Sequence, residues 1–245
     1  MGLAETLKKI NRKEQFNPGL LGVFISAGYF IKRGIYRGIR RNSSSMSGTM
    51  LDFGCGNKPY RRLFTVDRYI GIDIENSAHS HEGEPVDFIY DGRKIPFENK
   101  YFDCAFASEV FEHVFNLDEA LDELNRVLKE GGNLLITIPF AWYQHEKPND
   151  YARYTEFGIR HLLEKHKFKI VVHEKTSAFF ETAVQLWISY LYEGVFPKNN
   201  FLKILLSIFF IAPFNIFGII GSKIFPKNYD FYLNHIIVAK KAGDS

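Results

Sequence analysis

The sequence predicts an α/β protein built around a doubly wound, Rossmann-like sheet. Over residues 49–175, short apolar runs alternate with helical patterns, which is typical of a parallel sheet with helical crossovers. Glycines or acidic residues follow several of these runs, as expected where the strands of such a sheet end beside a ligand. The apolar share of 46% and the charged share of 24% are those of an ordinary globular protein, which excludes a disordered chain.

Each element follows from its local pattern. Strand-like runs bounded by turn residues are found at 49–53, 69–74, 86–90, 102–107, 133–138, 169–173 and 232–240. Residues 117–129 carry an apolar stripe at helical spacing, and Gly131 and Gly132 are expected to end that helix. A second helix is expected over 156–167. The length of 245 residues suits one core domain with additions.

Composition divides the chain into regions. Residues 1–48 form a basic arm, 49–175 the core, 176–229 a hydrophobic, aromatic-rich helical insertion, and 230–245 the last strand with a tail. Within residues 1–41, nine Lys or Arg against two Glu give a net charge of +7, in a protein of net charge +3. This favours an anionic partner, a membrane surface or a nucleic acid, over a merely solvated helix. Residues 43–48 are expected to be a flexible link, and two cysteines favour a reducing compartment without disulfides.

The chemistry-bearing residues share one position, the carboxyl ends of the first four strands, where ligands bind in such sheets. Glycines after the first strand let a ligand approach the backbone closely. A carboxylate ending the second strand can accept both ribose hydroxyls, and one after the third can accept from the amine of adenine. A dinucleotide site would need a third glycine where Pro59 stands, and no Walker loop is present. The predicted cofactor-binding residues are Asp52, Gly54, Cys55, Gly56, Asp73, Ile74, Asp91, Gly92 and Ser108.

The chain resembles class I S-adenosylmethionine-dependent methyltransferases in a series of motifs: Leu51-Asp52-Phe53-Gly54-Cys55-Gly56, Gly71-Ile72-Asp73, Ile95-Pro96-Phe97, Phe102-Asp103-Cys104-Ala105, Glu112-His113-Val114 and Arg126-Val127-Leu128-Lys129-Glu130-Gly131-Gly132. The resemblance covers roughly residues 49–175 and implies a seven-stranded sheet whose last strand is antiparallel. It also implies S-adenosyl-L-methionine as the cofactor. The glycine loop, ordered by Asp52, would hold its amino-acid end, and Asp73 its ribose. Asp91 with Gly92 would hold its adenine, and Ser108 would border its methionine end.

Two further segments, 56–61 and 145–155, resemble a branch of that family associated with cell-surface glycan or lipid biosynthesis. The chain also departs from the family pattern at two places. Lys58 stands at the position of the usual third glycine, so the loop is expected to sit differently near the methionine moiety. Only 17 residues separate Asp73 from Asp91, so the helix between the second and third strands is expected to be short or missing.

Methyl transfer is an in-line displacement, so the protein mostly has to align and desolvate the reactants. A base is needed only for an acceptor such as a hydroxyl. The predicted catalytic residues are His145, Asp150 and His113, because they follow the fourth and fifth strands on the ligand side. The alternatives are a loop histidine bonded to Asp150 for structure and a histidine that begins a helix. No metal is expected, since His145, Glu146 and Asp150 lack a recognisable ligand spacing.

Two apolar segments flank the core. Residues 204–222 carry no charge and are nominally long enough to span a bilayer, but Pro213 and Asn215 interrupt them. We expect residues 201–225 to form a bent hairpin or an interfacial helix pair that turns near Pro213 and does not cross the membrane. Residues 19–31 are apolar too, but Lys32 and Arg33 follow where a cleavable signal needs small residues. The alternative is that both segments form a buried cap over the substrate pocket.

The expected function is methyl transfer to a lipid, a lipid-linked glycan or another amphipathic small molecule, in the cytoplasm at the inner face of the membrane. One alternative is a catalytically silent binding or scaffold protein that keeps the fold. Another is a soluble small-molecule methyltransferase. A nucleic-acid substrate is disfavoured, because Ser108-Glu109-Val110-Phe111 stands where an Asn/Asp-Pro-Pro-aromatic motif would follow the fourth strand.

Overall fold

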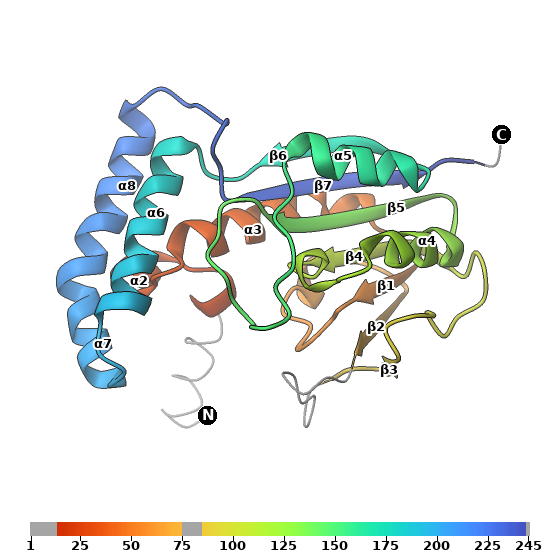
Figure 1. The fold of residues 1–245 in the computed structure, drawn as a ribbon, viewed down its shortest axis with the longest axis horizontal. Helices are drawn as coiled ribbons and strands as arrows, with labels where there is room; N and C mark the ends of the chain where they lie inside the picture. Colours follow the sequence, from red (N-terminus) through yellow and green to blue (C-terminus); the bar gives the residue numbers. More distant parts are fainter. Residues whose placement is uncertain (1–13, 75–84, 244–245) are drawn as a thin grey trace. The chain divides into compact units, whose positions relative to one another are not determined.

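The computed structural model describes residues 14–74 and 85–243 and divides into two compact units (Figure 1). The sheet unit comprises Gly38–Glu174 with the segment from His235 onward. The helical unit comprises the chain up to Arg37 and the segment Lys175–Asn234. The division falls inside helix α3 (Tyr29–Asn42), whereas the sequence analysis placed the end of the arm at residue 48.

The sheet unit contains the predicted seven-stranded sheet, in the order β3-β2-β1-β4-β5-β7-β6. Strand β1 lies between β2 and β4 and is parallel to both, so the chain reverses its direction of winding there. Strand β7 is antiparallel and lies between β5 and β6. The predicted fold class is thus confirmed. The strands are β1 (Thr49–Phe53), β2 (Arg68–Ile74), β3 (Phe88–Tyr90), β4 (Phe102–Ser108), β5 (Leu128–Pro139), β6 (Phe168–Lys175) and β7 (Asn234–Lys241).

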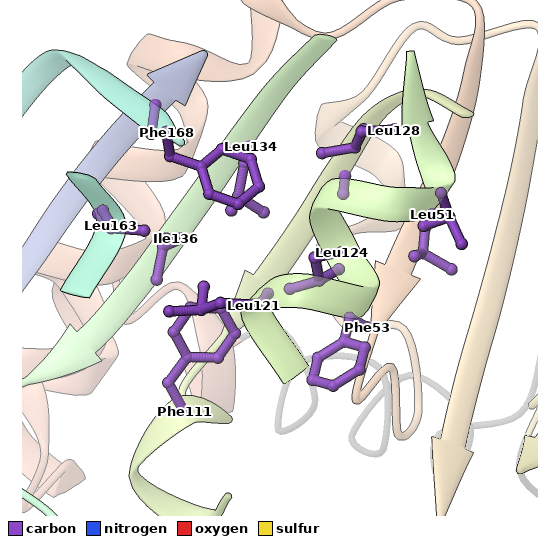
Figure 2. Packing of buried hydrophobic residues seen from close by; sticks show 14 of the residues in the cluster. Leu51, Phe53, Phe111, Leu121, Leu124, Leu128, Leu134, Ile136, Leu163 and Phe168 are labelled. Atoms are coloured by element: carbon purple, nitrogen blue, oxygen red, sulfur yellow. The ribbon is translucent and has the colours of Figure 1, made fainter. Parts of the chain in front are cut away.

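One face of the sheet is covered by helices α4 (Leu117–Val127) and α5 (Glu156–Lys165). Their apolar stripes meet the alternate strand residues that point to this face, and Figure 2 shows part of the resulting core. Leu121 and Leu124 are fully buried there, and each such side chain stabilises the fold by about 1.5–3 kcal/mol. Packing on this face fixes the strand ends that carry the site.

The opposite face of the sheet unit packs against the end of α3. A Cβ at Gly38 would lie 2.5 Å from Cγ1 of Ile236, so glycine lets the helix approach β7 closely. The segment after α3 is ordered as a 3₁₀ turn, Ser43–Ser45, and the expected flexible link is therefore wrong. The side chain of Asn133 donates to the carbonyl of Ser45 at 2.7 Å, and Met46 is buried, which together order this segment.

The boundary between α4 and β5 differs from the prediction. The helix ends at Val127, and Leu128 already pairs with Phe102 of β4, so the glycines lie inside the strand instead of ending the helix. Gly131 adopts a φ of 72°, which glycine tolerates readily. Most of the connection from β2 to β3, expected to hold a short helix or none, lies outside the described residues.

The helical unit contains α2 (Leu20–Ile25), the first part of α3, and α6 (Phe179–Tyr190). A π-helical turn, Leu191–Val195, follows α6. Next come α7 (Asn200–Leu206), a second π-helical turn, Ser207–Ile211, and α8 (Ala212–Ile224). The expected turn near Pro213 is wrong, because the helix continues through it. Pro213 lies in the first turn of α8, directly after the π segment, where its missing N–H is tolerated.

The hairpin of the helical unit is instead formed by α6 and α8, which pack against each other. Among the described residues, one continuous helical stretch, Leu202–Ile224, is long and apolar enough to cross a membrane by length and composition alone. An 18-residue window of this stretch has a mean hydropathy of 2.3, and 33% of that window is buried.

Candidate active site

The loop after β1 turns sharply at its glycines. The N–H groups of Gly54 and Cys55 both donate to the carbonyl of Ile72 on β2, at 3.0 Å each. Gly54 has a φ of 70°, and a Cβ there would lie 2.6 Å from Val110, so no other residue fits without strain. Gly56 has a φ of 43°, and a Cβ there would meet nothing within 4 Å. Open space therefore adjoins the backbone where the cofactor is expected to lie.

Asp73, at the end of β2, is joined to this loop. Its Oδ2 accepts the N–H of Gly56 at 2.8 Å, and its Oδ1 accepts the N–H of Ile74 at 2.8 Å. A carboxylate can accept several hydrogen bonds at once, so these bonds are compatible with the predicted contacts to ribose hydroxyls. The structure thus brings together the glycine loop and the acidic strand end that were expected to bind one ligand.

Lys58, which stands where the family pattern has glycine, adopts a φ of 48°. Its backbone thus takes a conformation that glycine adopts easily and that costs other residues energy. Its Nζ lies 2.6 Å from Oδ2 of Asp87, which also accepts the N–H of Gly71 at 2.7 Å. The loop keeps the glycine-like backbone, and the lysine side chain is directed along β2 to Asp87.

Asp52 lies within β1 and is buried, and its carboxylate accepts a hydrogen bond from the hydroxyl of Tyr69 on β2. Burial raises the pKa of Asp52 to about 7, although the bond from Tyr69 opposes this rise. The contact joins two central strands directly below the loop. The predicted role of Asp52 in ordering the loop stays a prediction.

Asp91 and Gly92 lie in the turn after β3. The Oδ1 of Asp91 accepts the N–H groups of Arg93 at 2.9 Å and Lys94 at 3.1 Å, and these bonds lower the pKa of this exposed carboxyl. Gly92 has a φ of 78°. This is the geometry of a carboxylate that caps a turn. A contact with adenine stays a prediction.

Ser108 ends β4 beside β5. Its hydroxyl lies 2.8 Å from that of Thr137, which in turn donates to Oε1 of Glu109 at 2.7 Å. Because the Thr137 hydrogen is used for Glu109, the Ser108 hydroxyl is the donor of the first bond. Glu109 has a φ of 55°, and its N–H donates to the carbonyl of Thr137 at 2.9 Å. The ends of the two strands are thus tied together beside the predicted methionine end of the cofactor.

The two predicted catalytic histidines are neighbours. His113 ends the 3₁₀ turn Phe111–His113 after β4, and His145 lies in the loop after β5. Their Nε2 atoms are 3.2 Å apart, and their rings are nearly perpendicular, with centroids 4.7 Å apart. The Nδ1 of His113 lies 2.6 Å from the carbonyl oxygen of Asn149. Since a carbonyl only accepts, this bond places the His113 proton on Nδ1 and leaves Nε2 as an acceptor.

Asp150 orients the His145 loop from the other side. Its carboxylate accepts hydrogen bonds from both Nη atoms of Arg153, at 2.6 and 2.8 Å, and from the backbone N–H of His145 at 2.9 Å. Burial opposes ionisation of Asp150, but these bonds prevail and lower its pKa to about 2. Burial and the proximity of His113 lower the pKa of His145. His145 is therefore neutral at pH 7, as a base or a ligand must be. The bonds of Asp150 to this loop are those expected from the alternative in which Asp150 has a structural role.

Glu112 is the residue of this site that the sequence analysis did not select. Its side chain is fully buried, and within residues 14–74 and 85–243 neither carboxylate oxygen has a hydrogen-bond partner. Its Oε1 lies 3.7 Å from Nε2 of His113 and 4.0 Å from Nε2 of His145. Burial, with the charge of Glu109, raises its pKa well above the ordinary range. The available signal was the pattern Glu109-x-x-Glu112-His113 directly after a strand.

Comparison with known proteins agrees with this site. Residues 51–136 match the family model described as a methyltransferase domain. Together with the sheet topology, the glycine loop and Asp73, this match makes the sheet unit similar to class I methyltransferase domains. Its cofactor is S-adenosyl-L-methionine, and the open space beside Gly56 and the bonded Asp73 fit that ligand.

Several proteins resemble the chain. It is 28% identical over 180 residues to the malonyl-[acyl-carrier protein] O-methyltransferase of Legionella pneumophila, covering 62% of each protein. It is 34% identical over 121 residues to the tRNA (carboxymethyluridine(34)-5-O)-methyltransferase of Arabidopsis thaliana, covering 47% of this chain and 29% of that one. The chain thus spans less than two thirds of either relative.

Solved structures share the fold. The phosphoethanolamine N-methyltransferase 2 of Haemonchus contortus matches with a TM-score of 0.54 and 17% identity, covering 95% of this chain and 60% of that one. The [4+2]-cyclase SpnF matches with a TM-score of 0.52 and 19% identity, covering 86% and 80%.

Proposed function

We propose that this protein transfers a methyl group from S-adenosylmethionine to a lipid, a lipid-linked glycan or another amphipathic small molecule at the cytoplasmic surface of a membrane. The relatives do not select the acceptor, since their names specify a tRNA, a malonyl-acyl carrier protein and, for a match over 63 residues in Caenorhabditis elegans, a sterol. The methyltransferase core is therefore compatible with several acceptors. The support for a membrane-bound acceptor comes from the helical unit.

The observation that carries the proposal is the distribution of side chains around Leu202–Ile224. Apart from Ile211, the residues of this stretch that are buried within the helical unit are small or polar: Ser207, Ala212, Asn215, Gly218 and Gly221. The exposed stripe consists of large apolar residues: Leu202, Ile204, Leu205, Ile208, Phe209, Phe210, Ile216, Phe217, Ile220 and Ile224. This distribution is the reverse of that in a water-facing helix, and so large an exposed apolar patch marks contact with lipid or a partner.

The buried stripe allows close packing within the helical unit. A Cβ at Gly218 would lie 2.4 Å from Cζ of Phe30, and one at Gly221 would lie 2.0 Å from Cε1 of Phe180. The side chain of Asn215 is buried and donates to the carbonyls of Val23 at 2.9 Å and Ser26 at 3.1 Å. Small residues at helix contacts and a polar side chain that donates to the backbone of a neighbouring segment are features of helices that pack in an apolar medium.

The path of the chain favours a position of Leu202–Ile224 in the membrane interface over a crossing of the membrane. Strands β6 and β7, which precede and follow the helical insertion, are neighbours in one sheet. A single crossing between them would separate two strands that must lie together. Helix α6, even with the π turn that continues it, is not a second stretch long and apolar enough to span among the described residues. Lys198, Lys203, Lys223 and Lys227 stand near the ends of the apolar stretch, and each basic residue near an anionic surface contributes about 1 kcal/mol.

In this function the residues of the sheet unit align the reactants. The bound cofactor supplies the methyl group. Asp73 and the glycine loop hold the cofactor at the ends of β1 and β2, while Ser108, His113 and His145 line the ends of β4 and β5. A neutral His145 can accept the proton of an acceptor hydroxyl there.

The membrane contact can be tested by sedimentation of the full chain with vesicles of phosphatidylcholine that contain phosphatidylglycerol. We expect binding that weakens as salt increases, because exposed apolar and basic residues both contribute. Ile208→Ser with Phe209→Ser should weaken binding at least about 10-fold, since two apolar side chains leave the interface. The matched control, Phe157→Ser with Val171→Ser, changes two exposed apolar residues of the sheet unit and should leave binding unchanged.

A protein that does not sediment with vesicles would overturn the membrane part of the proposal and favour the buried cap. For the acceptor, membrane extracts incubated with the protein and S-adenosylmethionine should contain a lipid or glycan that gains about 14 Da by mass spectrometry. Cofactor binding without a methylated product in any extract would favour a silent scaffold.

A further inference from the structure

We propose that Glu112, His113 and His145 bind a divalent transition-metal cation such as Zn²⁺ beside the methyl-transfer site. One carboxylate oxygen of Glu112 and one nitrogen of each histidine lie within 4.8 Å of one another. The three residues come from two loops that follow neighbouring strands, so the sheet itself brings them together. The binding part of this inference does not depend on the identity of the acceptor.

The distances suit a shared cation. Zinc binds nitrogen and oxygen ligands at about 2.0–2.2 Å, which places neighbouring ligand atoms roughly 3.0–3.5 Å apart. In this cluster the Nε2 atoms of the histidines are 3.2 Å apart, and Oε1 of Glu112 lies 3.7 and 4.0 Å from them. Two histidines and a carboxylate form a ligand set of catalytic zinc and other transition metals, whereas Mg²⁺ and Ca²⁺ prefer oxygen alone.

The unpartnered carboxylate of Glu112 is the independent observation. Both of its oxygens are buried, and none of the described residues donates a hydrogen bond to either. A buried carboxylate without a donor is destabilising, and proteins retain such a group where a ligand completes it. Oε1 of Glu112 lies within 4.0 Å of both Nε2 atoms, so a cation between the three atoms would satisfy the carboxylate.

The outer contacts orient the imidazoles for this purpose. The carbonyl of Asn149 holds the proton of His113 on Nδ1, which leaves its Nε2 lone pair directed at the cluster. The Nδ1 of His145 lies 3.5 Å from Oδ2 of Asp150 and 3.3 Å from Nη2 of Arg153. Both hydrogens of that Nη2 already have acceptors, the carbonyl of Tyr143 at 3.1 Å and Asp150 at 2.8 Å. Without a cation, the Nε2–H of His145 donates to the Nε2 of His113. A cation would take the place of that proton, and the imidazole of His145 would then hold its proton on Nδ1, 3.5 Å from Oδ2 of Asp150.

The cluster is open on one side. The side chain of Glu112 is fully buried, but those of His113 and His145 are 15% and 26% exposed. Glu146, with a carboxylate oxygen 3.6 Å from Nε2 of His113, lies at the exposed edge. Three protein ligands with an open position are the arrangement of a catalytic cation. At the ends of β4 and β5, its charge would favour the deprotonated form of an acceptor hydroxyl, a role that rests on the proposed function.

The test is calorimetric titration of the full chain, freed of metal by a chelator, with ZnCl₂, and with MgCl₂ for comparison. We expect one strong Zn²⁺ site and weak Mg²⁺ binding. Glu112→Gln and His145→Gln should each weaken Zn²⁺ binding by more than about 100-fold, because loss of an outer-shell partner alone costs about 10–100-fold. The control, His166→Gln, alters a histidine that contacts Asp118 and Asp122 elsewhere in the sheet unit and should leave the strong site intact.

The Glu112→Gln variant also serves as a control for folding. Glu112→Gln removes an unpartnered buried carboxylate, so the metal-free variant should melt at or above the temperature of the metal-free parent. Titration with CoCl₂ should give visible absorption bands in the parent and not in this variant. Zn²⁺ affinity that is equal in the parent, Glu112→Gln and His145→Gln would overturn the inference. Zn²⁺ binding without methyl transfer would count against the proposed function alone, and methyl transfer by a protein that binds no cation would count against the inference alone.

Discussion

Oδ2 of Asp73 accepts the backbone N–H of Gly56 at 2.8 Å, so the acidic end of β2 and the glycine loop after β1 form one unit. The same carboxylate accepts the N–H of Ile74 through its other oxygen. A change at Asp73 therefore affects both the predicted ribose contact and the shape of the loop. We therefore expect cofactor binding to be sensitive to substitution at Asp73.

Asp73→Ala should weaken S-adenosylmethionine binding by about 30- to 1000-fold, equivalent to the loss of about 2–4 kcal/mol of charge-assisted hydrogen bonding. Isothermal titration calorimetry measures this directly. Asp103→Ala is the matched control, because Asp103 also accepts a backbone N–H, that of Thr49 at 2.8 Å, but at the amino end of β1. Unchanged affinity in Asp73→Ala would remove Asp73 from the cofactor site.

Gly54 and Gly56 should respond differently to alanine. Gly54→Ala combines a φ of 70° with a Cβ 2.6 Å from Val110, so we expect it to lower the free energy of unfolding by about 2 kcal/mol or more. Gly56→Ala meets no atom within 4 Å and should cost about 1 kcal/mol for the backbone alone. It should nevertheless weaken cofactor binding, because its Cβ enters the open space. Urea denaturation and calorimetry on both variants test this, and equal stability losses would contradict it.

Asp52 should make stability depend on pH. Its pKa of about 7 in the folded protein lies above the ordinary value of 3.8, so the folded state holds the proton more tightly than the unfolded state. The stabilisation is fully present below about pH 4 and is lost as pH rises through 7, by roughly 4 kcal/mol in all. Asp52→Asn, which keeps an acceptor for Tyr69, should remove this loss. Parallel pH dependences of unfolding in the two proteins would show that folding does not raise the pKa of Asp52.

His145→Ala should lower kcat by about 10²–10⁴ while cofactor affinity stays unchanged. The expectation holds whether His145 accepts a proton or binds a cation, since either role is lost with the imidazole. Because the pKa of His145 is lowered, the parent should keep its activity down to pH values at which an ordinary histidine is protonated. His161→Ala, on the exposed side of α5, is the control. Full activity of His145→Ala would leave His113 as the remaining histidine of the site.

Local pattern was enough to predict the strands and the order of their functional ends. Strands β1, β2 and β4 contain alternating or continuous apolar residues, and glycine, aspartate or serine stands at their carboxyl ends. Such patterns depend on only a few neighbouring residues. The sheet topology then places those ends at one edge. For this reason Asp73, the glycine loop and Ser108 could be selected before any contact was known.

Contacts between distant residues decided the rest. Residues 128 and 129 belong to the helix that the sequence predicts, yet pairing of Leu128 with Phe102 draws them into β5. Pro213 is accommodated because a π turn precedes it, which no local rule at Pro213 indicates.

The cluster of Glu112, His113 and His145 arises only in the folded chain. Its members come from loops separated by a helix and a strand, and the fold leaves the Glu112 carboxylate buried without a donor. Burial and hydrogen-bond satisfaction are properties of the packed chain, and sequence spacing contains neither of them.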